Sequence, residues 1–424
     1  MTFTTSRRSF LALSGLAGAG LAAPVWGKSR GVSVPSPALQ AVLDRWVADK
    51  HVPGAVASMA RGLDQAVFMM AGTQSFDDAA AMTPDSLFRA YSMTKPLTGM
   101  AAMILIGEGR LGMDQNIADI LPAFANPRVM TDPEHSLASR PAKSPITVRS
   151  LLTHTAGLGY TITSKGPLLD AYLKNGLYAA QASRAPLEGM PSFPHPTSLA
   201  DFADRLATLP LIADPGTMWS YSLSLDLLGR VIEVVAGMPF ETFLQSRIFK
   251  PLGMTGSYFQ VPDVAAKRLT TNYVLKDGKP LPLDPARDSI YLDKPPCTYG
   301  GAGLVTSPRD WDRFLLMLAG EGALGRTRIM SRETARWAMS NLLHPDTKVG
   351  GWMTGQGFGA GGRVVLNAVP GGESVGSFGW GGAASTTGWV DRTKGVRATG
   401  WVQLMTMNAP QLFPIDIAKA VYSS

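Results

Sequence analysis

The spacing of apolar residues predicts two amphipathic helices near the beginning of the chain. Residues 38–49 carry apolar side chains at intervals of three and four, and Ser36 followed by Pro37 is a favourable helix start. Residues 92–108 show the same spacing, with glycines at its end. The first helix therefore has one buried face, and the second is apolar enough to be largely enclosed.

Strand-like segments lie towards both ends of the chain, whereas the middle is helical in pattern. The predicted strands are residues 55–60, 66–70, 363–366, 386–390 and 400–405. This order predicts an α/β fold of the α+β type, in which one antiparallel sheet is built from the N- and C-terminal parts and flanked by helices. We expect the sheet domain to comprise residues 31–91 and 259–424, and an inserted all-helical domain to comprise residues 92–258.

Composition narrows the classes of function. The chain has 424 residues, of which 45% are hydrophobic and 17% charged, as in globular proteins. Its net charge of +7 is dispersed, so we expect no nucleic-acid partner. The single cysteine, Cys297, excludes an intramolecular disulfide and a cysteine-rich zinc site. The histidines lack metal-ligand spacing, and we expect neither a metal nor another cofactor. Nothing in the composition indicates the oligomeric state.

The first residues resemble an export signal. Arg7 and Arg8 precede an apolar, glycine-rich run from about residue 10 to residue 25. Paired arginines before such a run are typical of a twin-arginine signal, which we place at residues 1–27. The run is short for a membrane span. We therefore expect a bacterial protein that the export machinery delivers to the periplasm or the exterior, without a stable membrane anchor in the mature form.

Ser92 and Lys95 form the strongest candidate for catalytic chemistry. Positions i and i+3 share one face of a helix, so the lysine amine can reach the serine hydroxyl. Serine needs such activation because its free hydroxyl is a weak nucleophile. The partial positive charge at a helix N-terminus also favours the negative charge that develops during attack. An S-x-x-K motif alone is weak evidence for a catalytic serine, because an exposed serine that caps a helix, followed by a solvated lysine, has the same sequence.

The surrounding sequence resembles the serine β-lactamase-like superfamily, of the class C β-lactamase and family VIII carboxylesterase type. Besides the nucleophile segment L-F-R-A-Y-S-M-T-K, the resemblance rests on segments at residues 51–56, 151–158 (L-L-T-H-T-A-G-L), 247–254 (R-I-F-K-P-L-G-M) and 300–307 (G-G-A-G-L-V-T-S). It extends from about residue 38 to residue 405. Membership implies a serine enzyme that forms an acyl intermediate, on a β-lactamase/transpeptidase-like fold.

The resemblance implies further site residues. Tyr221, in W-S-Y-S-L, matches the family tyrosine that exchanges a proton with the lysine, here Lys95; which of the two acts as the base stays open. The oxyanion hole is expected from the backbone N–H groups of Ser92 and Ala383. The remaining expected substrate contacts are Trp380, Gly381, Gly382 and Leu223.

Three other motifs suggest alternative catalytic residues. Ser374 lies in a G-x-S-x-G motif, but no histidine follows it, as an α/β-hydrolase nucleophile would require. Lys348 begins K-V-G, which imitates the K-T-G of β-lactamases but is expected to be a turn. His154 is a possible base, and we expect it instead to hold its loop by hydrogen bonds.

Two departures from the β-lactamase pattern indicate the reaction. Trp380 stands where β-lactamases carry the lysine that binds the drug carboxylate, and Leu223 stands where they carry an asparagine. Apolar groups at both positions favour small neutral esters. The sequence thus predicts a carboxylesterase that cleaves short-chain esters through an acyl-enzyme on Ser92. The alternatives are a β-lactamase or D-alanyl-D-alanine carboxypeptidase, amide hydrolysis or acyl transfer, and a non-catalytic relative that binds peptidoglycan or another ligand.

Overall fold

The structure is a computed structural model that describes residues 31, 33–185, 193–406 and 410–423. The predicted export signal, residues 1–27, lies outside the described residues. Within the described part of the chain, no helix combines the length and the apolar character that crossing a membrane requires.

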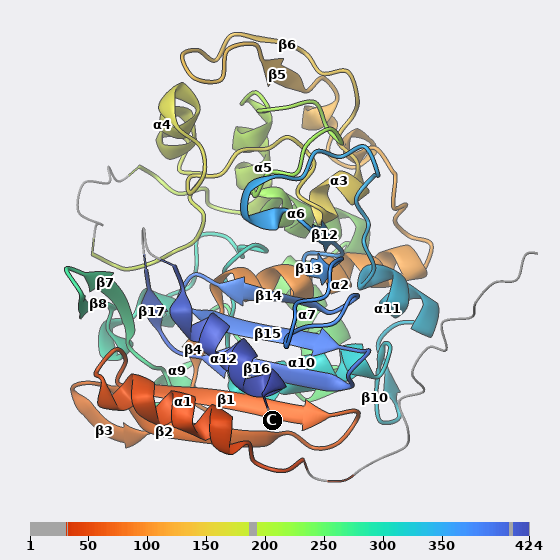
Figure 1. Ribbon diagram of the computed structural model, residues 1–424. Coiled ribbons are helices and arrows are strands. Elements are labelled where there is room, and N and C mark those ends of the chain that lie inside the picture. The colour runs from red at the N-terminus through yellow and green to blue at the C-terminus, as the bar shows by residue number, and fades with distance from the viewer. Residues whose placement is uncertain (1–30, 32, 186–192, 407–409, 424) are drawn as a thin grey trace, which may run out of the picture.

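The largest element is an antiparallel sheet of eight strands (Figure 1). In spatial order its strands are β12 (Gln356–Phe358), β13 (Arg363–Val365), β14 (Phe378–Gly382), β15 (Thr386–Asp391), β16 (Val396–Trp401), β1 (Gly54–Arg61), β2 (Val67–Ser75) and β3 (Asp78–Ala81). The N-terminal strand β1 pairs with the C-terminal strand β16, with Val56 opposite Trp401. The sheet is therefore assembled from both ends of the chain, as the sequence predicts.

Helices cover both faces of this sheet. Helices α1 (Pro37–Ala48) and α12 (Leu412–Tyr422) pack together on the face towards the viewer in Figure 1. Helix α10 (Pro308–Ala319) packs against β1, β15 and β16 from the other face. Because both faces are covered, β1 is buried at every position except its last, Arg61. Alternation of apolar and polar residues is consequently lost in this strand.

The predicted helical domain, residues 92–258, is mostly helical and includes helix α2 (Thr94–Gly107). Its other helices are α3 (Val148–Leu152), α4 (Gly166–Lys174), α5 (Leu199–Ala207), α6 (Ser224–Ala236), α7 (Phe240–Leu244), the π-turn Gln245–Phe249 and α8 (Lys250–Leu252). It also contains a hairpin of β5 (Arg128–Met130) and β6 (Ser139–Pro141). Thus the segment is not purely helical.

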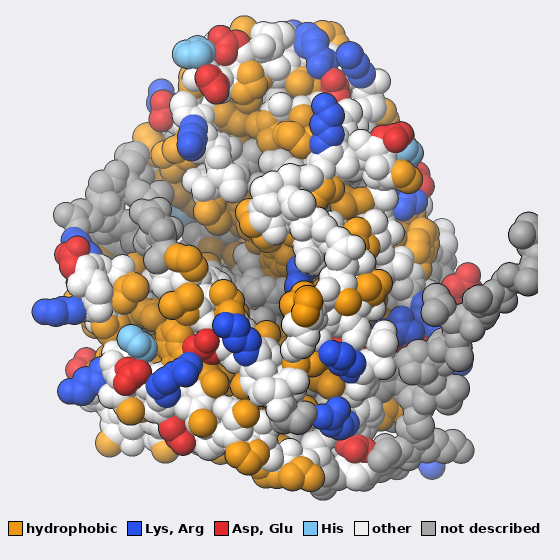
Figure 2. Space-filling view, in the orientation of Figure 1, with side chains coloured by type: hydrophobic (Ala, Val, Ile, Leu, Met, Phe, Trp, Pro, Cys, Tyr) orange, Lys and Arg blue, Asp and Glu red, His pale blue; other side chains and the backbone are white. Residues whose placement is uncertain are grey.

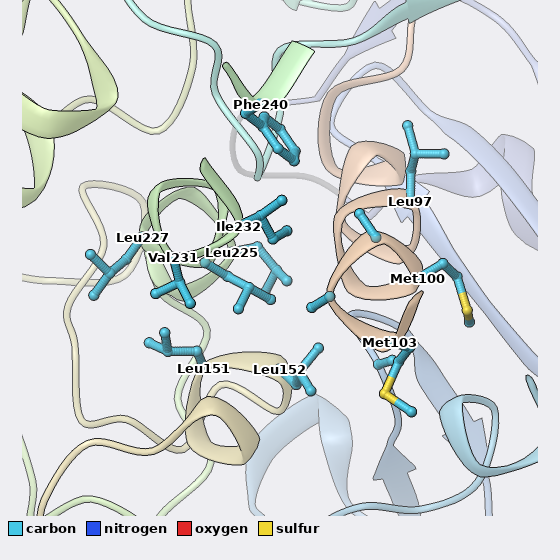
Figure 3. Packing of buried hydrophobic residues seen from close by; sticks show 14 of the residues in the cluster. Leu97, Met100, Met103, Leu151, Leu152, Leu225, Leu227, Val231, Ile232 and Phe240 are labelled. Atoms are coloured by element: carbon cyan, nitrogen blue, oxygen red, sulfur yellow. The ribbon is translucent and has the colours of Figure 1, made fainter. Parts of the chain in front are cut away.

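Helix α2 links the helical segment to the sheet. Leu97, Met100 and Met103 of α2 belong to the same buried hydrophobic cluster as Leu225 and Ile232 of α6. In Figure 3, Leu97 and Met100 project from the side of α2 that faces away from α6. The same continuous hydrophobic cluster includes residues of the large sheet. Burial on nearly all sides explains why α2 is apolar around its circumference.

The remaining elements are short. They comprise β4 (Phe88–Arg89) paired with β9 (Val305–Thr306), a small sheet of β17 (Leu404–Met405), β7 (Asn272–Lys276) and β8 (Lys279–Asp284), the hairpin β10 (Ala323–Leu324) and β11 (Thr327–Arg328), and the helices α9 (Asp263–Ala266) and α11 (Arg332–Ala338).

One strand prediction was wrong in detail. Residues 400–405 are not one strand, because the chain leaves the large sheet after Trp401 and joins the small sheet at Leu404. Between them, the buried side chain of Gln403 forms hydrogen bonds with the backbone N–H and carbonyl of Arg89. These side-chain bonds replace ladder bonds at the crossing from one sheet to the other.

Candidate active site

Ser92 lies in a 3-10 turn, Tyr91–Met93, directly before helix α2. The predicted helix therefore begins slightly later than expected. Tyr91 adopts a φ of 44°, in the left-handed region that residues other than glycine rarely occupy. Its side chain is buried, and its hydroxyl accepts a hydrogen bond of 2.9 Å from Asn272. Such strain is typical of functional sites, and here it sets Ser92 at the N-terminal end of the helix.

The structure brings together the three residues that the sequence predicts as catalytic. Lys95 Nζ lies 3.1 Å from Ser92 Oγ, and the Tyr221 hydroxyl lies 2.7 Å from the same oxygen. Both distances allow hydrogen bonds. Ser92 and Tyr221 are separated by 129 positions in the chain, so their meeting depends on the fold. The hydroxyl of Ser92 thus has a nitrogen and an oxygen within reach of its proton.

Lys95 is fully buried, and its surroundings contain an acidic residue that sequence reasoning missed. Lys95 Nζ donates to the carbonyl of Gly301 at 2.8 Å, and the N–H of Gly301 donates to Asp226 Oδ1 at 2.8 Å. Burial raises the pKa of the Asp226 carboxyl to about 6, although the charge of Lys95 and the Gly301 N–H counteract it. Asp226 thus contributes to the electrostatic environment of Lys95. It stands five residues after Tyr221 at the start of α6, where an acidic residue is also favourable for helix formation alone.

Aromatic rings fix the position of Tyr221. Trp219 stacks on it with the ring planes 16° apart, and His154 lies 4.8 Å away between ring centroids. The indole N–H of Trp380 points at the Tyr221 hydroxyl, 3.3 Å away. Lys95 Nζ lies 4.5 Å from the Tyr221 ring centroid, within the range of a cation–π interaction. A charge on the Tyr221 oxygen would therefore have both a donor and a cation nearby.

Tyr160 is a further residue of the site that sequence reasoning missed. Its hydroxyl lies 3.4 Å from Lys95 Nζ, and its ring packs edge-on against Tyr221. Burial, together with the negative charges possible at Tyr221 and Asp226, holds the pKa of Tyr160 well above its usual 10. Tyr160 is therefore a neutral hydroxyl at physiological pH. It stands only two residues beyond the segment L-L-T-H-T-A-G-L, so its nearness to that segment was the available signal.

His154 occupies a supporting position. It is fully buried, and its Nδ1 lies 3.2 Å from the N–H and 3.0 Å from the hydroxyl of Ser222. Burial, reinforced by Lys95, lowers the pKa of His154 well below its usual 6.5. The ring is thus neutral and holds the residue next to Tyr221, in agreement with its predicted role as a loop anchor.

Strand β14 brings the predicted oxyanion donor to the nucleophile. Gly382, its last residue, approaches the chain so closely that an added Cβ would overlap the carbonyl of Ala90 and the hydroxyl of Thr386. Only glycine fits this contact, and it places Ala383 beside the turn that carries Ser92. Ala383 and Ser92 line the same pocket.

This pocket, of about 360 Å³, lies where the surface is hollowed between the helical segment and the large sheet (Figure 2). Its lining is mostly apolar or aromatic and consists of Ser92, Ile162, Tyr221, Trp352, Arg363, Trp380, Gly381, Gly382, Ala383, Thr387, Gly388, Trp389, Gln411 and Pro414. Of the predicted substrate contacts, Trp380, Gly381 and Gly382 are present.

Leu223 is the exception. It is absent from the pocket lining, and its side chain is fully buried in the hydrophobic core. Leu223 immediately precedes α6, and its N–H donates to the carbonyl of Gly159. The expectation of direct substrate contact therefore requires correction, because a helix start directs this apolar side chain into the core.

The remaining alternative motifs lie apart from these contacts. Ser374 is in the loop between β13 and β14, with its N–H bonded to Asp391, and no helix follows it as a nucleophile elbow requires. Lys348 pairs through its backbone with Thr217 and Trp219. The position of Ser374 agrees with the expectation that it is not the nucleophile. The expected turn at Lys348 was wrong, because this residue forms an isolated parallel bridge with Met218.

Comparisons with known proteins identify the family of the chain. The sequence profile of the Beta-lactamase family matches residues 39–418. The chain is 30% identical to esterase EstB of Burkholderia gladioli, over 84% of this chain and 88% of the relative. It is 30% identical to the lovastatin esterase of Penicillium rubens, over 75% and 80% of the two chains.

A solved structure is similar to this chain in fold. It is described as EstCE1, a hydrolase with promiscuous acyltransferase activity, and superposes with a TM-score of 0.74 at 26% identity, covering 91% of this chain and 97% of the other. The family profile spans most of the chain and includes the segments that carry Ser92, Lys95 and Tyr221. This chain belongs to the Beta-lactamase family.

Proposed function

We propose that this protein is a serine hydrolase that cleaves carboxylic esters through an acyl-enzyme on Ser92. The observation that carries the proposal is the position of Ser92 Oγ, 3.1 Å from Lys95 Nζ and 2.7 Å from the Tyr221 hydroxyl. A serine oxygen within reach of a proton acceptor at the edge of a pocket is the arrangement that nucleophilic catalysis requires.

In the first step, Ser92 Oγ bonds to the ester carbonyl carbon while its proton passes to the Lys95–Tyr221 pair. The carbonyl oxygen takes up the negative charge and accepts hydrogen bonds from the N–H groups of Ser92 and Ala383. Collapse of this intermediate breaks the bond to the alcohol oxygen, which receives the proton back from the pair. The products of this step are a free alcohol and an acyl group on Ser92.

In the second step, water attacks the acyl carbon and gives its proton to the same pair. The ester bond to Ser92 breaks, the proton returns to Ser92 Oγ, and the carboxylic acid leaves. The pair therefore acts as base and as acid in each half of the reaction, and it ends in its starting protonation state.

The lining of the pocket supports a neutral substrate. Trp380 supplies an indole ring where the family's β-lactamases have a lysine, and Ile162 and Trp352 add apolar surface nearby. An apolar wall favours acyl chains. Arg363 also lines the pocket, but it is paired with Glu373 at 2.6 Å, so a drug carboxylate would have to compete with that acid for it. The small volume of the pocket favours short acyl groups.

Acyl transfer to an alcohol is the second candidate. It follows the same first step and differs only in the acceptor that attacks the acyl-enzyme. The description of EstCE1 as a hydrolase with promiscuous acyltransferase activity supports this alternative. The apolar wall of the pocket supports it too, because such a wall can contact the carbon chain of an alcohol.

The test compares substrates on the purified protein. We expect turnover of p-nitrophenyl butyrate, slower turnover of the octanoate, and little turnover of a chromogenic cephalosporin. Ser92→Ala should abolish hydrolysis, and Ser374→Ala serves as the matched serine control that retains it. Fast cephalosporin hydrolysis without esterase activity would replace the proposal with a β-lactamase, and binding without any turnover would indicate a non-catalytic relative.

A further inference from the structure

Gln411 makes side-chain hydrogen bonds that the reaction steps above do not use. Its Nε2 donates to the carbonyl of Gly382 at 3.2 Å and to the carbonyl of Ala383 at 2.9 Å. Two carbonyl acceptors fix the orientation of the amide, because only its nitrogen can donate to them. Gln411 also lines the pocket that contains Ser92. A residue outside the sheet thus forms hydrogen bonds with the turn that follows strand β14.

The Gln411 side chain forms these hydrogen bonds instead of capping its own helix. Gln411 is the N-cap residue of α12, and its side chain makes no capping hydrogen bond. N-cap side chains usually accept from the first turn of their own helix. Here the amide turns away from α12 towards the β14–β15 turn. The helix therefore serves as a platform that carries Gln411 to the pocket.

The first of these bonds acts on the peptide that supplies the oxyanion donor. The carbonyl of Gly382 and the N–H of Ala383 belong to one planar trans peptide, in which they point in opposite directions. A donor that holds the carbonyl on one side therefore aims the N–H towards the other side. The N–H of Ser385 also donates to this carbonyl, at 3.0 Å, so the peptide is held by one backbone and one side-chain donor.

Resting on the proposed function, we propose that Gln411 is a positioning residue for the oxyanion hole. It orients the Gly382–Ala383 peptide and polarises it, which makes the Ala383 N–H a stronger donor. A group that acts in this way contributes mainly when negative charge develops on the substrate oxygen. Its loss should consequently lower kcat and leave the binding of the neutral ester nearly unchanged.

The test measures kcat and KM for p-nitrophenyl butyrate, together with inhibition by an aliphatic trifluoromethyl ketone, which gives an oxyanion when Ser92 adds to it. Gln411→Met keeps the size of the side chain and removes the donor. We expect kcat to fall about tenfold, less than the loss of a whole oxyanion donor, with KM within twofold. The inhibition constant of the ketone should rise by about the same factor as kcat falls.

Two further variants make the result specific. Gln411→Lys restores a long donor and should recover most of the lost kcat, and it also provides a test if the methionine variant folds poorly. Leu412→Ala truncates the exposed neighbouring side chain and should change neither constant. A rise in KM with unchanged kcat, or wild-type values in Gln411→Met, would overturn the role of Gln411 and leave the proposed function intact. Absence of ester turnover by the wild-type protein would overturn both.

Discussion

Two groups lie within hydrogen-bonding distance of Ser92 Oγ, and their other partners differ. Lys95 Nζ donates to the carbonyl of Gly301, which favours a cation at this position. The Tyr221 hydroxyl faces the indole N–H of Trp380, which favours a negative charge on its oxygen. These partners support a division of labour in which the Tyr221 oxygen takes the proton of Ser92 while Lys95 stabilises the charge that results.

This division predicts unequal effects for two neighbouring tyrosines. Tyr221→Phe should lower kcat by about a hundredfold or more, the usual contribution of a general acid–base group, because no oxygen then accepts the proton directly. Tyr160→Phe removes a buried hydroxyl 3.4 Å from Lys95 Nζ and is the matched control, with an expected loss of no more than about tenfold. Steady-state kinetics on p-nitrophenyl butyrate measure both. A Tyr160→Phe loss as large as that of Tyr221→Phe would contradict the assignment.

Asp226 predicts a component of the pH dependence of stability. The pKa of this carboxyl is raised to about 6 by burial, so the folded protein binds the proton more tightly than the unfolded chain. The associated stability is complete below about pH 4 and is lost as the pH rises through 6. Relative to Asp226→Asn, the wild-type protein should lose on the order of 2–3 kcal/mol of unfolding free energy between pH 4 and 7, measured by denaturant titration.

A second aspartate provides a control of opposite sign. Arg140 and the Lys143 N–H lower the pKa of Asp214 to about 2, so its contribution is present above about pH 4 and is lost as the pH falls. Compared with Asp214→Asn, the wild-type protein should therefore lose stability towards acid. Parallel pH curves for the wild-type protein and Asp226→Asn would contradict the raised pKa of the Asp226 carboxyl.

At the scale of elements, the close approach of strand β14 to the Ser92 turn determines whether the oxyanion hole forms. Gly382 contacts the carbonyl of Ala90, one residue before the 3-10 turn, and the hydroxyl of Thr386 across the strand pair. Backbone groups at such a contact cannot move aside without displacing the strand. The relative position of β14 and α2 therefore depends on the absence of a side chain at residue 382.

Two glycine substitutions test this dependence. Gly382→Ala should reduce kcat at least about tenfold, because the added Cβ displaces the turn that carries the Ala383 donor. Gly112→Ala is the control, since its Cβ would meet a neighbour, Gln115 Cβ, at 3.2 Å and Gly112 does not line the pocket. Its kcat should stay within about threefold of wild type, as a small shift of the neighbour relieves such a contact. Equal losses in the two variants would contradict the account.

At the scale of the whole molecule, sequence patterns predicted the sheet built from both chain ends and the motif Ser92–Lys95. Tyr221 and Ala383 came from the family resemblance, because they join the site only through the fold. Asp226 and Tyr160 were missed, since a buried acid at a helix start and a tyrosine after a loop carry no periodic signal. Leu223 was wrongly assigned to the pocket, because a leucine in the sequence indicates an apolar environment but does not distinguish the pocket wall from the core.

The predicted export signal leads to a prediction about the compartment in which the protein is found. We propose that residues 1–27 direct export of the folded protein, on the basis of Arg7 and Arg8 before an apolar run. Replacing both by lysine should leave esterase activity and the uncleaved chain in the cytoplasmic fraction of the bacterial host. Recovery of the processed protein from the periplasm of the double variant would contradict a twin-arginine route.

The most direct test of the account is the identity of the acylated residue. The protein should be mixed with a p-nitrophenyl ester, quenched in acid during turnover, digested and examined by mass spectrometry. We predict an acyl group on the peptide that contains Ser92, absent from Ser92→Ala and retained in Ser374→Ala. An acyl group on Ser374, or undiminished turnover by Ser92→Ala, would contradict the central claim.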